Sequence, residues 1–258
     1  MAATAAHLEH LLRQTRLPAF FRSLGAEDAG RLLAQVEHFT TVEAEHRDAR
    51  IIEYLGEAGL SRLIERLAQE IITRAPATAP DVLDVGVGSG TFTIPVLQRV
   101  RRELPGARFY ALDVTPAMLR ALARRAPEII PFLGLAENIA GSIQYAQQYL
   151  PVPDRFDLLL STLTLHHSPN ILQVFASIAS ALNRRGTVLL ADLLEHSFAD
   201  FREEMGDYHL GFQPAQLHAV ASRFFAEVQV QPLPDITCSS AGRSVGLFFA
   251  IFAKPRRR

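Results

Sequence analysis

The sequence predicts an α/β fold in which a seven-stranded, mostly parallel sheet carries helices on both faces. Three observations support this fold class. Short apolar runs typical of buried strands alternate with helical stretches after residue 80, a pattern typical of parallel strands joined by crossover helices. A glycine-rich turn follows the first apolar run. Two longer runs rich in β-branched and aromatic residues come near the end of the sequence.

The alternating region predicts five strands and four helices. Apolar runs of four to six residues are the right length for buried strands, and apolar residues repeating every three or four positions indicate helices. The strands are expected at 82–85, 108–112, 129–133, 156–160 and 187–191, and the helices at 92–103, 116–126, 143–149 and 170–183.

The C-terminal part predicts an antiparallel edge. A helix is expected at 214–223, followed by strands at 225–230 and 245–253. A loop containing Pro232, Pro234 and Gly242 is expected to join these two strands, and it is longer than a tight hairpin. The sheet therefore has five parallel strands plus two, with the last strand antiparallel.

The first 75 residues predict helices that lie outside this alternation. Their apolar residues repeat at helical spacing until the stretch from Pro76 to Pro80, where two prolines end the helical pattern. We expect a helical extension at 1–75 and the sheet domain at 76–258. The extension is either a lid that excludes water from a reacting centre or an element for packing and dimerisation.

The composition excludes several classes of protein. Of the 258 residues 48% are apolar, which excludes general disorder, and no apolar run reaches the roughly 18 residues of a membrane helix. The formal net charge of −1 gives no long-range attraction for nucleic acid. A single cysteine, Cys238, excludes an internal disulfide, and we expect it far from the functional site. No signal peptide is apparent, so the cytoplasm is the expected location.

The glycine-rich turn indicates a ligand pocket. Gly86, Gly88 and Gly90 follow the first strand, where a backbone without side chains lets a ligand approach closely. The third glycine comes one residue too early for the dinucleotide fingerprint, and the carboxylate of Asp84 would repel phosphates but attract an ammonium group. The turn therefore favours a nucleoside with a cationic end, the alternative being a turn that serves only the fold.

Asp113 follows the second strand, in the position that binds ribose hydroxyls in such sheets. Its carboxylate can accept hydrogen bonds from both hydroxyls. The alternative is a helix N-cap, but Thr115 before Pro116 already suits that role.

These residues resemble the class I S-adenosylmethionine-dependent methyltransferases over about residues 80–255. The resemblance rests on the motifs at 83–90, 111–119 and 156–161, and on the leucine and histidines at 165–167. It implies S-adenosyl-L-methionine as the cofactor and a seven-stranded Rossmann-like sheet with an antiparallel last strand. The implied contacts are Asp84, Gly86, Gly88 and Gly90 near the methionine, Asp113 and Val114 at the ribose, and Ser161 at the methyl end.

The adenine contact departs from the family pattern. Relatives often have an aspartate where this chain has Leu135. Stacking, the backbone of Ala136, or the side chains of Glu137 or Asn138 are the open alternatives for holding the adenine.

Two segments are candidates for the acceptor site. His166 follows the fourth predicted strand and is a candidate catalytic base, or alternatively a packing residue. The stretch at 207–212 is similar to a His-x-Gly-Phe segment of quinone-biosynthesis methyltransferases. This similarity implies a catalytic role for His209 and acceptor contacts for Tyr208 and Phe212.

We therefore expect an S-adenosylmethionine-dependent methyltransferase acting on a small, apolar or aromatic acceptor. We expect no metal, no nucleic acid and no membrane span, and a homodimer is the assembly considered. The alternatives are an RNA or protein methyltransferase, which would show a basic strip near the pocket, and a non-catalytic cofactor-binding module, which would show a blocked acceptor pocket. A nucleotide-dependent oxidoreductase is disfavoured by the early third glycine.

Overall fold

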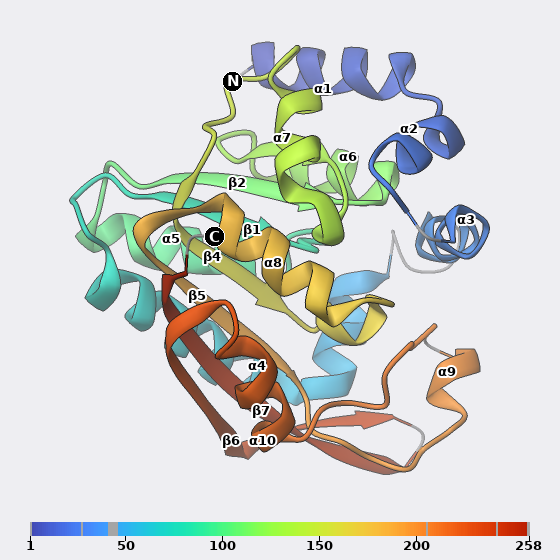
Figure 1. Ribbon diagram of the computed structural model, residues 1–258, viewed down its shortest axis with the longest axis vertical. Coiled ribbons are helices and arrows are strands. Elements are labelled where there is room, and N and C mark those ends of the chain that lie inside the picture. The colour runs from blue at the N-terminus through green and yellow to red at the C-terminus, as the bar shows by residue number, and fades with distance from the viewer. Residues whose placement is uncertain (1, 27, 41–45, 205, 241, 257–258) are drawn as a thin grey trace.

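One seven-stranded sheet forms the centre of the protein. The computed structural model describes residues 2–26, 28–40, 46–204, 206–240 and 242–256. The strands lie in the order β3-β2-β1-β4-β5-β7-β6 (Figure 1). They are β1 (Asp81–Val85), β2 (Arg108–Asp113), β3 (Ile130–Leu133), β4 (Phe156–Thr162), β5 (Leu182–Leu193), β6 (Phe225–Ser240) and β7 (Arg243–Pro255).

The strand directions confirm the predicted fold class. The pairs β1–β2, β1–β4, β2–β3 and β4–β5 are parallel, whereas β7 runs antiparallel to both β5 and β6. The chain order reverses between β1 and β4. In open sheets of this kind, ligands bind outside the carboxyl ends of the strands at such a reversal.

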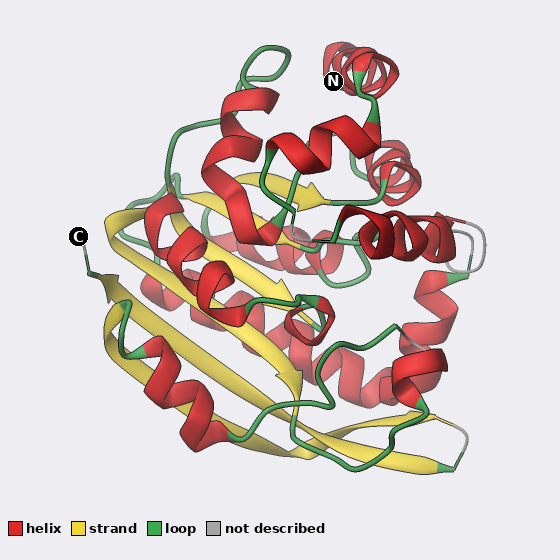
Figure 2. Cartoon of the chain, turned by 45° about the vertical axis from the view of Figure 1, so that its right-hand side comes forward, coloured by secondary structure: helices red, strands yellow, loops and turns green. Residues whose placement is uncertain are grey.

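Helices cover both faces of the twisted sheet (Figure 2). Local signals set where they begin: Pro116 occupies the first turn of α6, and the Asn170 side chain accepts the amide of Gln173 at the start of α8. The helices after β1 are α5 (Thr93–Glu103), α6 (Pro116–Arg125), α7 (Ile139–Ala146), α8 (Ile171–Ala181), α9 (Phe201–Glu204) and α10 (Pro214–Ala221), with short 3₁₀ turns η2 (Ala136–Asn138) and η3 (Leu165–His167).

Two predicted boundaries are wrong. Helix α7 begins at Ile139 rather than at residue 143, because the Asn138 side chain accepts the amide of Gly141 and caps the helix. Strand β5 begins at Leu182, where the sequence predicted that the preceding helix would continue to residue 183. The strand begins early because Leu182 pairs with Phe156 of β4, and a register shift separates this pair from the rest of the ladder.

The predicted long loop between the last two strands is also wrong. Strand β6 continues through Pro232 and Pro234 to Ser240, and β7 begins at Arg243. The prolines are tolerated because β6 is an edge strand that pairs only with β7. A register shift between Leu233 and Thr237 absorbs the irregularity. The pair therefore forms a long ribbon that runs toward the segment carrying α9 (Figure 1).

The N-terminal helices share the hydrophobic core of the sheet. They are α1 (Ala2–Gln14), α2 (Leu17–Ser23), α3 (Ala29–His38) and α4 (Arg47–Arg74), the last kinked at Gly56. Helix α4 packs against α5 and β6, and α1 packs against β3 and α6. Leu11, Leu63 and Ile71 are fully buried in one cluster with the sheet residues. No helix among the described residues is long and apolar enough to cross a membrane.

The start of α4 is joined to the glycine-rich turn by Asp48. The Asp48 carboxylate accepts hydrogen bonds from the hydroxyls of Ser89 (2.8 Å) and Thr91 (2.5 Å) and pairs with Arg125 (2.5 Å). Burial works to raise the pKa of Asp48, but these three partners together hold it below its usual value. Arg125 also donates to the carbonyl of Ser89 at 3.0 Å. The helical extension is therefore held to the turn by a polar network as well as by the core.

Replacing Asp48 should loosen this connection. Asp48→Ala removes two hydroxyl hydrogen bonds and one ion pair, so we expect a loss of roughly 1–3 kcal/mol in the free energy of unfolding, measured with urea. The exposed Glu53 lies on the same helix, and Glu53→Ala serves as the control with no comparable loss. Equal stability of the two variants would contradict a structural role for Asp48.

Candidate active site

A large pocket lies at the carboxyl ends of β1, β2 and β4, as the strand order predicts. It holds about 1220 Å³ of space outside protein atoms, part of it open to solvent. Its walls come from the glycine-rich turn, from the ends of β2 and β4, from η2, and from the N-terminal helices. Of the residues predicted to bind cofactor or acceptor, it is lined by Gly86, Gly88, Asp113, Val114, Ala136, Glu137 and Tyr208.

Two glycines of the turn serve different purposes. Both have a positive φ, 77° at Gly86 and 56° at Gly88, which favours glycine. A Cβ atom at Gly86 would lie 2.1 Å from the Thr164 side chain, so this glycine allows the turn to pack on the segment after β4. A Cβ atom at Gly88 would meet nothing within 4 Å. Gly88 therefore leaves open space inside the pocket.

Asp113 is tied to this turn. One carboxylate oxygen accepts the amide of Gly88 and the other accepts the amide of Thr115, each at 2.8 Å. Burial raises the pKa of Asp113, while these two amides act to lower it. Thr115, rather than Asp113, occupies the N-cap position of α6. Asp113 is thus placed at the pocket wall with one lone pair on each oxygen engaged by the backbone.

Asp84 lies beneath the turn rather than at the pocket wall. It is 3% exposed, accepts a short hydrogen bond from the Thr93 hydroxyl, and has one oxygen without a hydrogen-bond partner among the described residues. Burial raises the pKa of Asp84 to about 6, the bond from Thr93 opposes this rise, and the charge of Asp113 adds to it. Gly90 also lies outside the pocket lining, and a Cβ atom there would meet Leu122 at 2.5 Å.

Two other predicted cofactor contacts have structural partners instead. The Asn138 side chain caps α7 and donates to the carbonyl of Leu24 at 2.9 Å. The Ser161 hydroxyl donates to the carbonyl of Val85 at 3.1 Å. Neither residue lines the pocket, which on this side is formed by Leu135, Ala136 and Glu137.

The N-terminal helices form one wall of the pocket. Sequence reasoning left their role open between a lid and a packing element, and the structure places them at the site. The charged residues that line the pocket are Asp28, Arg47, Asp113 and Glu137. The other lining residues from the N-terminal part are Gly25, Ala26, Leu32, Gln35, Phe39 and Ile51.

A turn with two histidines follows β4. His166 is buried and its Nδ1 lies 2.6 Å from an oxygen of Asp192. The second oxygen of Asp192 accepts the backbone amides of Thr164 and Leu165. Burial works to lower the pKa of His166, but the negative charge of Asp192 and the hydrogen bond to it raise that pKa above its usual value. Asp192 therefore fixes both the turn and the ring of His166.

His167 differs from its neighbour in charge and in place. Burial and the nearby charges of His166 and Arg47 hold the pKa of His167 well below its usual value, so the ring is neutral at neutral pH. His167 lines the large pocket, whereas His166 does not. The sequence named only His166 as a candidate, because nothing in two adjacent histidines indicates which ring faces the ligand.

A smaller pocket of about 470 Å³ adjoins the large one. The two share Phe39, Arg47, Ile51, Leu163 and His167. The remaining lining residues of the smaller pocket are His38, Tyr54, His166, Leu193 and Cys238.

The expectation that Cys238 lies far from the site is wrong. The extended β6 carries Cys238 to the wall of the smaller pocket, where the sequence analysis had placed a loop. Burial raises the pKa of this thiol to about 12, so it is protonated and is no nucleophile at neutral pH.

Of the predicted acceptor residues, only Tyr208 lies at the large pocket. The Arg31 guanidinium stacks over the Tyr208 ring at 3.5 Å. His209 is engaged with the carbonyl of Ser168 at 3.1 Å, and Phe212 packs edge-on against Phe248. Neither His209 nor Phe212 lines either pocket.

The sheet order and strand directions define an α/β domain with the Rossmann-like methyltransferase fold. Residues 83–188 match the sequence family described as a methyltransferase domain. Magnesium protoporphyrin IX methyltransferase from Synechocystis PCC 6803, solved with bound S-adenosylmethionine, shares the fold with a TM-score of 0.57 at 14% identity, over 88% of this chain and 99% of that one. Residues 83–188 therefore match a methyltransferase domain, and the fold of the chain is similar to that of methyltransferases solved with S-adenosylmethionine.

Two curated relatives are similar in sequence. A malonyl-[acyl-carrier protein] O-methyltransferase from Halorhodospira halophila is 29% identical over 199 residues, which is 76% of this chain and 59% of that protein. A biotin biosynthesis bifunctional protein from Teredinibacter turnerae is 30% identical over 148 residues, 55% of this chain and 25% of that protein. The chain thus spans only part of the length of these relatives.

The burial of Asp84 predicts a pH-dependent stability. Because its folded-state pKa of about 6 exceeds the unfolded value, the folded chain binds the extra proton, and stability falls as pH rises from about 4 to about 6. Asp84→Asn removes this cost. We expect the variant to match the wild type near pH 4 and to exceed it by roughly 3 kcal/mol at pH 8, measured by urea unfolding without cofactor. The exposed Asp235 supplies the control, Asp235→Asn. A stability difference between Asp84→Asn and the wild type that does not change with pH would contradict the raised pKa of Asp84.

Proposed function

We propose that the protein is an S-adenosylmethionine-dependent methyltransferase that methylates a small, mainly apolar or aromatic acceptor. The observation that carries this proposal is the open face of Gly88 beside the buried carboxylate of Asp113. Such a wall offers a carboxylate acceptor to the hydroxyls of an uncharged sugar and would repel a phosphate placed against it.

Different residues of the pocket would contact different parts of the cofactor. Gly86 and Gly88 would line the methionine part, and Asp113 would accept hydrogen bonds from the ribose hydroxyls with the lone pairs that the backbone amides leave available. Leu135 and Ala136 would pack against the adenine, and Glu137 would offer it a polar partner. When bound, the cofactor supplies a sulfonium methyl group. The remaining task of the protein is in-line placement of the acceptor, which can supply roughly 7–11 kcal/mol of the barrier at best.

The smaller pocket is the proposed acceptor space. It adjoins the large pocket through shared residues, and most of its lining is apolar or aromatic. The polar groups at the junction are Arg47 and His167, which suit an acceptor with one polar reacting end. His167 lines both pockets where they adjoin, and catalytic roles for His166 and His209 stay predictions.

The pocket also bears on the alternatives. A non-catalytic cofactor module would have no acceptor space next to the cofactor, yet the smaller pocket adjoins it. An RNA methyltransferase would gather cations around the opening, whereas the charged residues lining the large pocket are one arginine and three carboxylates. These features favour a small acceptor. A cytoplasmic location, a homodimer and a domain boundary at residues 75–76 stay expectations from the sequence.

Removing the ribose acceptor should weaken cofactor binding. Asp113→Ala loses one or two hydrogen bonds to a charged group, each worth roughly 1.5–3 kcal/mol, so we expect S-adenosylhomocysteine to bind at least about tenfold more weakly in calorimetric titration. Glu128→Ala, at an exposed position, should leave affinity unchanged. An Asp113→Ala protein that is folded and binds with wild-type affinity would remove Asp113 from the site.

Gly88 and Gly242 make a matched pair for testing the open face of the turn. Both have a positive φ, and a Cβ atom at either would meet nothing within 4 Å, but only Gly88 lines the pocket. Each glycine-to-alanine change should cost roughly 1–2 kcal/mol of stability for the left-handed backbone. Only Gly88→Ala should also weaken S-adenosylhomocysteine binding, by roughly 1–3 kcal/mol for the overlap. Similar affinities in the two variants would refute contact between the turn and the cofactor.

A further inference from the structure

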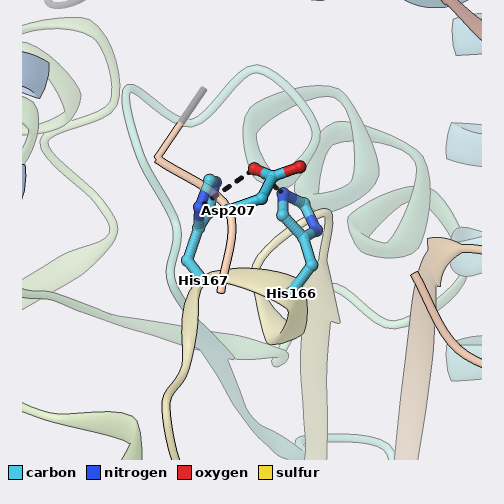
Figure 3. A group of neighbouring side chains, drawn as sticks. All are labelled: His166, His167 and Asp207. Atoms are coloured by element: carbon cyan, nitrogen blue, oxygen red, sulfur yellow. Dashed lines mark ion pairs between the residues drawn. The ribbon is translucent and has the colours of Figure 1, made fainter. Parts of the chain in front are cut away.

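We propose that His166, His167 and Asp207 form a binding site for a divalent transition-metal cation such as zinc. Asp207 Oδ1 lies 3.6 Å from Nε2 of His166 and 3.6 Å from Nδ1 of His167 (Figure 3). Ligands roughly 2.1 Å from a tetrahedral metal are about 3.4 Å apart. The three ligand atoms lie within 4.8 Å of one another, so a small ring rotation completes the geometry.

The carboxylate of Asp207 calls for a cation. Its side chain is fully buried, and neither oxygen has a hydrogen-bond partner among the described residues. Nδ1 of His167 is also buried and has no hydrogen-bond partner among the described residues. Buried charges are normally paired or bound to metal, and these unpartnered atoms face one another (Figure 3). A cation placed between them satisfies all of them at once.

The segment that carries Asp207 is anchored at this position. The backbone amides of Tyr208 and His209 both donate to the carbonyl of His166 at 3.0 Å. The Arg202 guanidinium also donates to the carbonyl of Tyr208 at 3.1 Å. Backbone hydrogen bonds between two segments far apart in the sequence therefore hold the Asp207 carboxylate next to the histidine turn.

Each histidine leaves one ring nitrogen for a metal. Nδ1 of His166 is paired with Asp192, which leaves Nε2 for a metal, and a carboxylate behind a ligating histidine is the usual outer contact of zinc sites. Nδ1 of His167 has no hydrogen-bond partner among the described residues and lies 3.6 Å from Asp207 Oδ1, so it is the ring nitrogen left for a metal.

The charge and the surroundings also suit a cation. The carboxylates of Asp192 and Asp207 lie 2.6 Å and 3.6 Å from the two ring nitrogens of His166. The positive charges of Arg47 and Arg202 also act on Asp207 and offset part of this negative charge. Two imidazoles and one carboxylate are the protein ligands of catalytic zinc sites, which keep a further position open. Both histidines line the smaller pocket, so that position would face the proposed acceptor space. The sequence does not predict this site, because the spacing of these residues forms no recognised metal-binding motif.

Direct metal binding tests this inference independently of methyl transfer. The full chain, without a histidine tag and treated with chelator, is titrated with Co²⁺ while visible absorption is recorded, and then with Zn²⁺ as competitor. We expect one ion per chain and a cobalt spectrum of nitrogen and oxygen ligation. Asp207→Asn and His167→Gln should each weaken binding by about 100-fold or more, since loss of an outer contact alone costs about 10- to 100-fold.

The control variant is His218→Gln, at an exposed histidine on α10, which should keep the ion at wild-type affinity. Asp207→Asn removes a buried charge without changing its shape, and a thermal unfolding curve checks that it folds. Absence of one bound ion in the wild type at micromolar metal would overturn the proposal, as would an unchanged ion in Asp207→Asn. If the wild-type protein binds the ion but does not bind S-adenosylhomocysteine, the result contradicts the proposed function and leaves the metal site supported.

Discussion

The site depends on the hydrogen bond from the Gly88 amide to the Asp113 carboxylate. It joins the turn after β1 to the end of β2, so the bare backbone and the buried acid are fixed as one unit. The left-handed conformation at Gly88 points its amide at the acid and leaves the opposite side free of atoms. Because two backbone amides already neutralise part of the Asp113 charge, this wall suits hydroxyl groups better than a group of full opposite charge.

The N-terminal helices complete the pocket that begins at the edge of the sheet. A parallel sheet offers a ligand only the floor of a pocket at its carboxyl edge, and the walls must come from other elements. Here α3 and the start of α4 supply a wall, and Asp48 links that wall to Ser89 and Thr91 in the glycine-rich turn. Movement of the helices and order in the turn are therefore coupled, since one cannot shift without breaking hydrogen bonds to the other.

The sequence predicted the fold and the edge of the sheet where the pocket lies, because both depend on local patterns. Strand-sized apolar runs fix the sheet, and the glycines with Asp113 mark its edge. The sequence did not decide which partner a side chain takes where several are open to it. Asn138 could face adenine or cap α7, and only the packed structure decides for the cap. Cys238 reaches the site because β6 tolerates prolines as an edge strand, which depends on the strand order and not on the local sequence.

Four buried carboxylates around the site differ in how the protein compensates them. Asp192 accepts several backbone amides and a histidine, and Asp113 accepts two amides. Asp84 has one hydroxyl and an oxygen without a partner, and Asp207 has no hydrogen-bond partner among the described residues. Burying a carboxylate costs free energy that folding alone has no reason to retain. The decreasing compensation therefore leaves Asp84 and Asp207 as the carboxylates of this set with oxygens that no described residue satisfies.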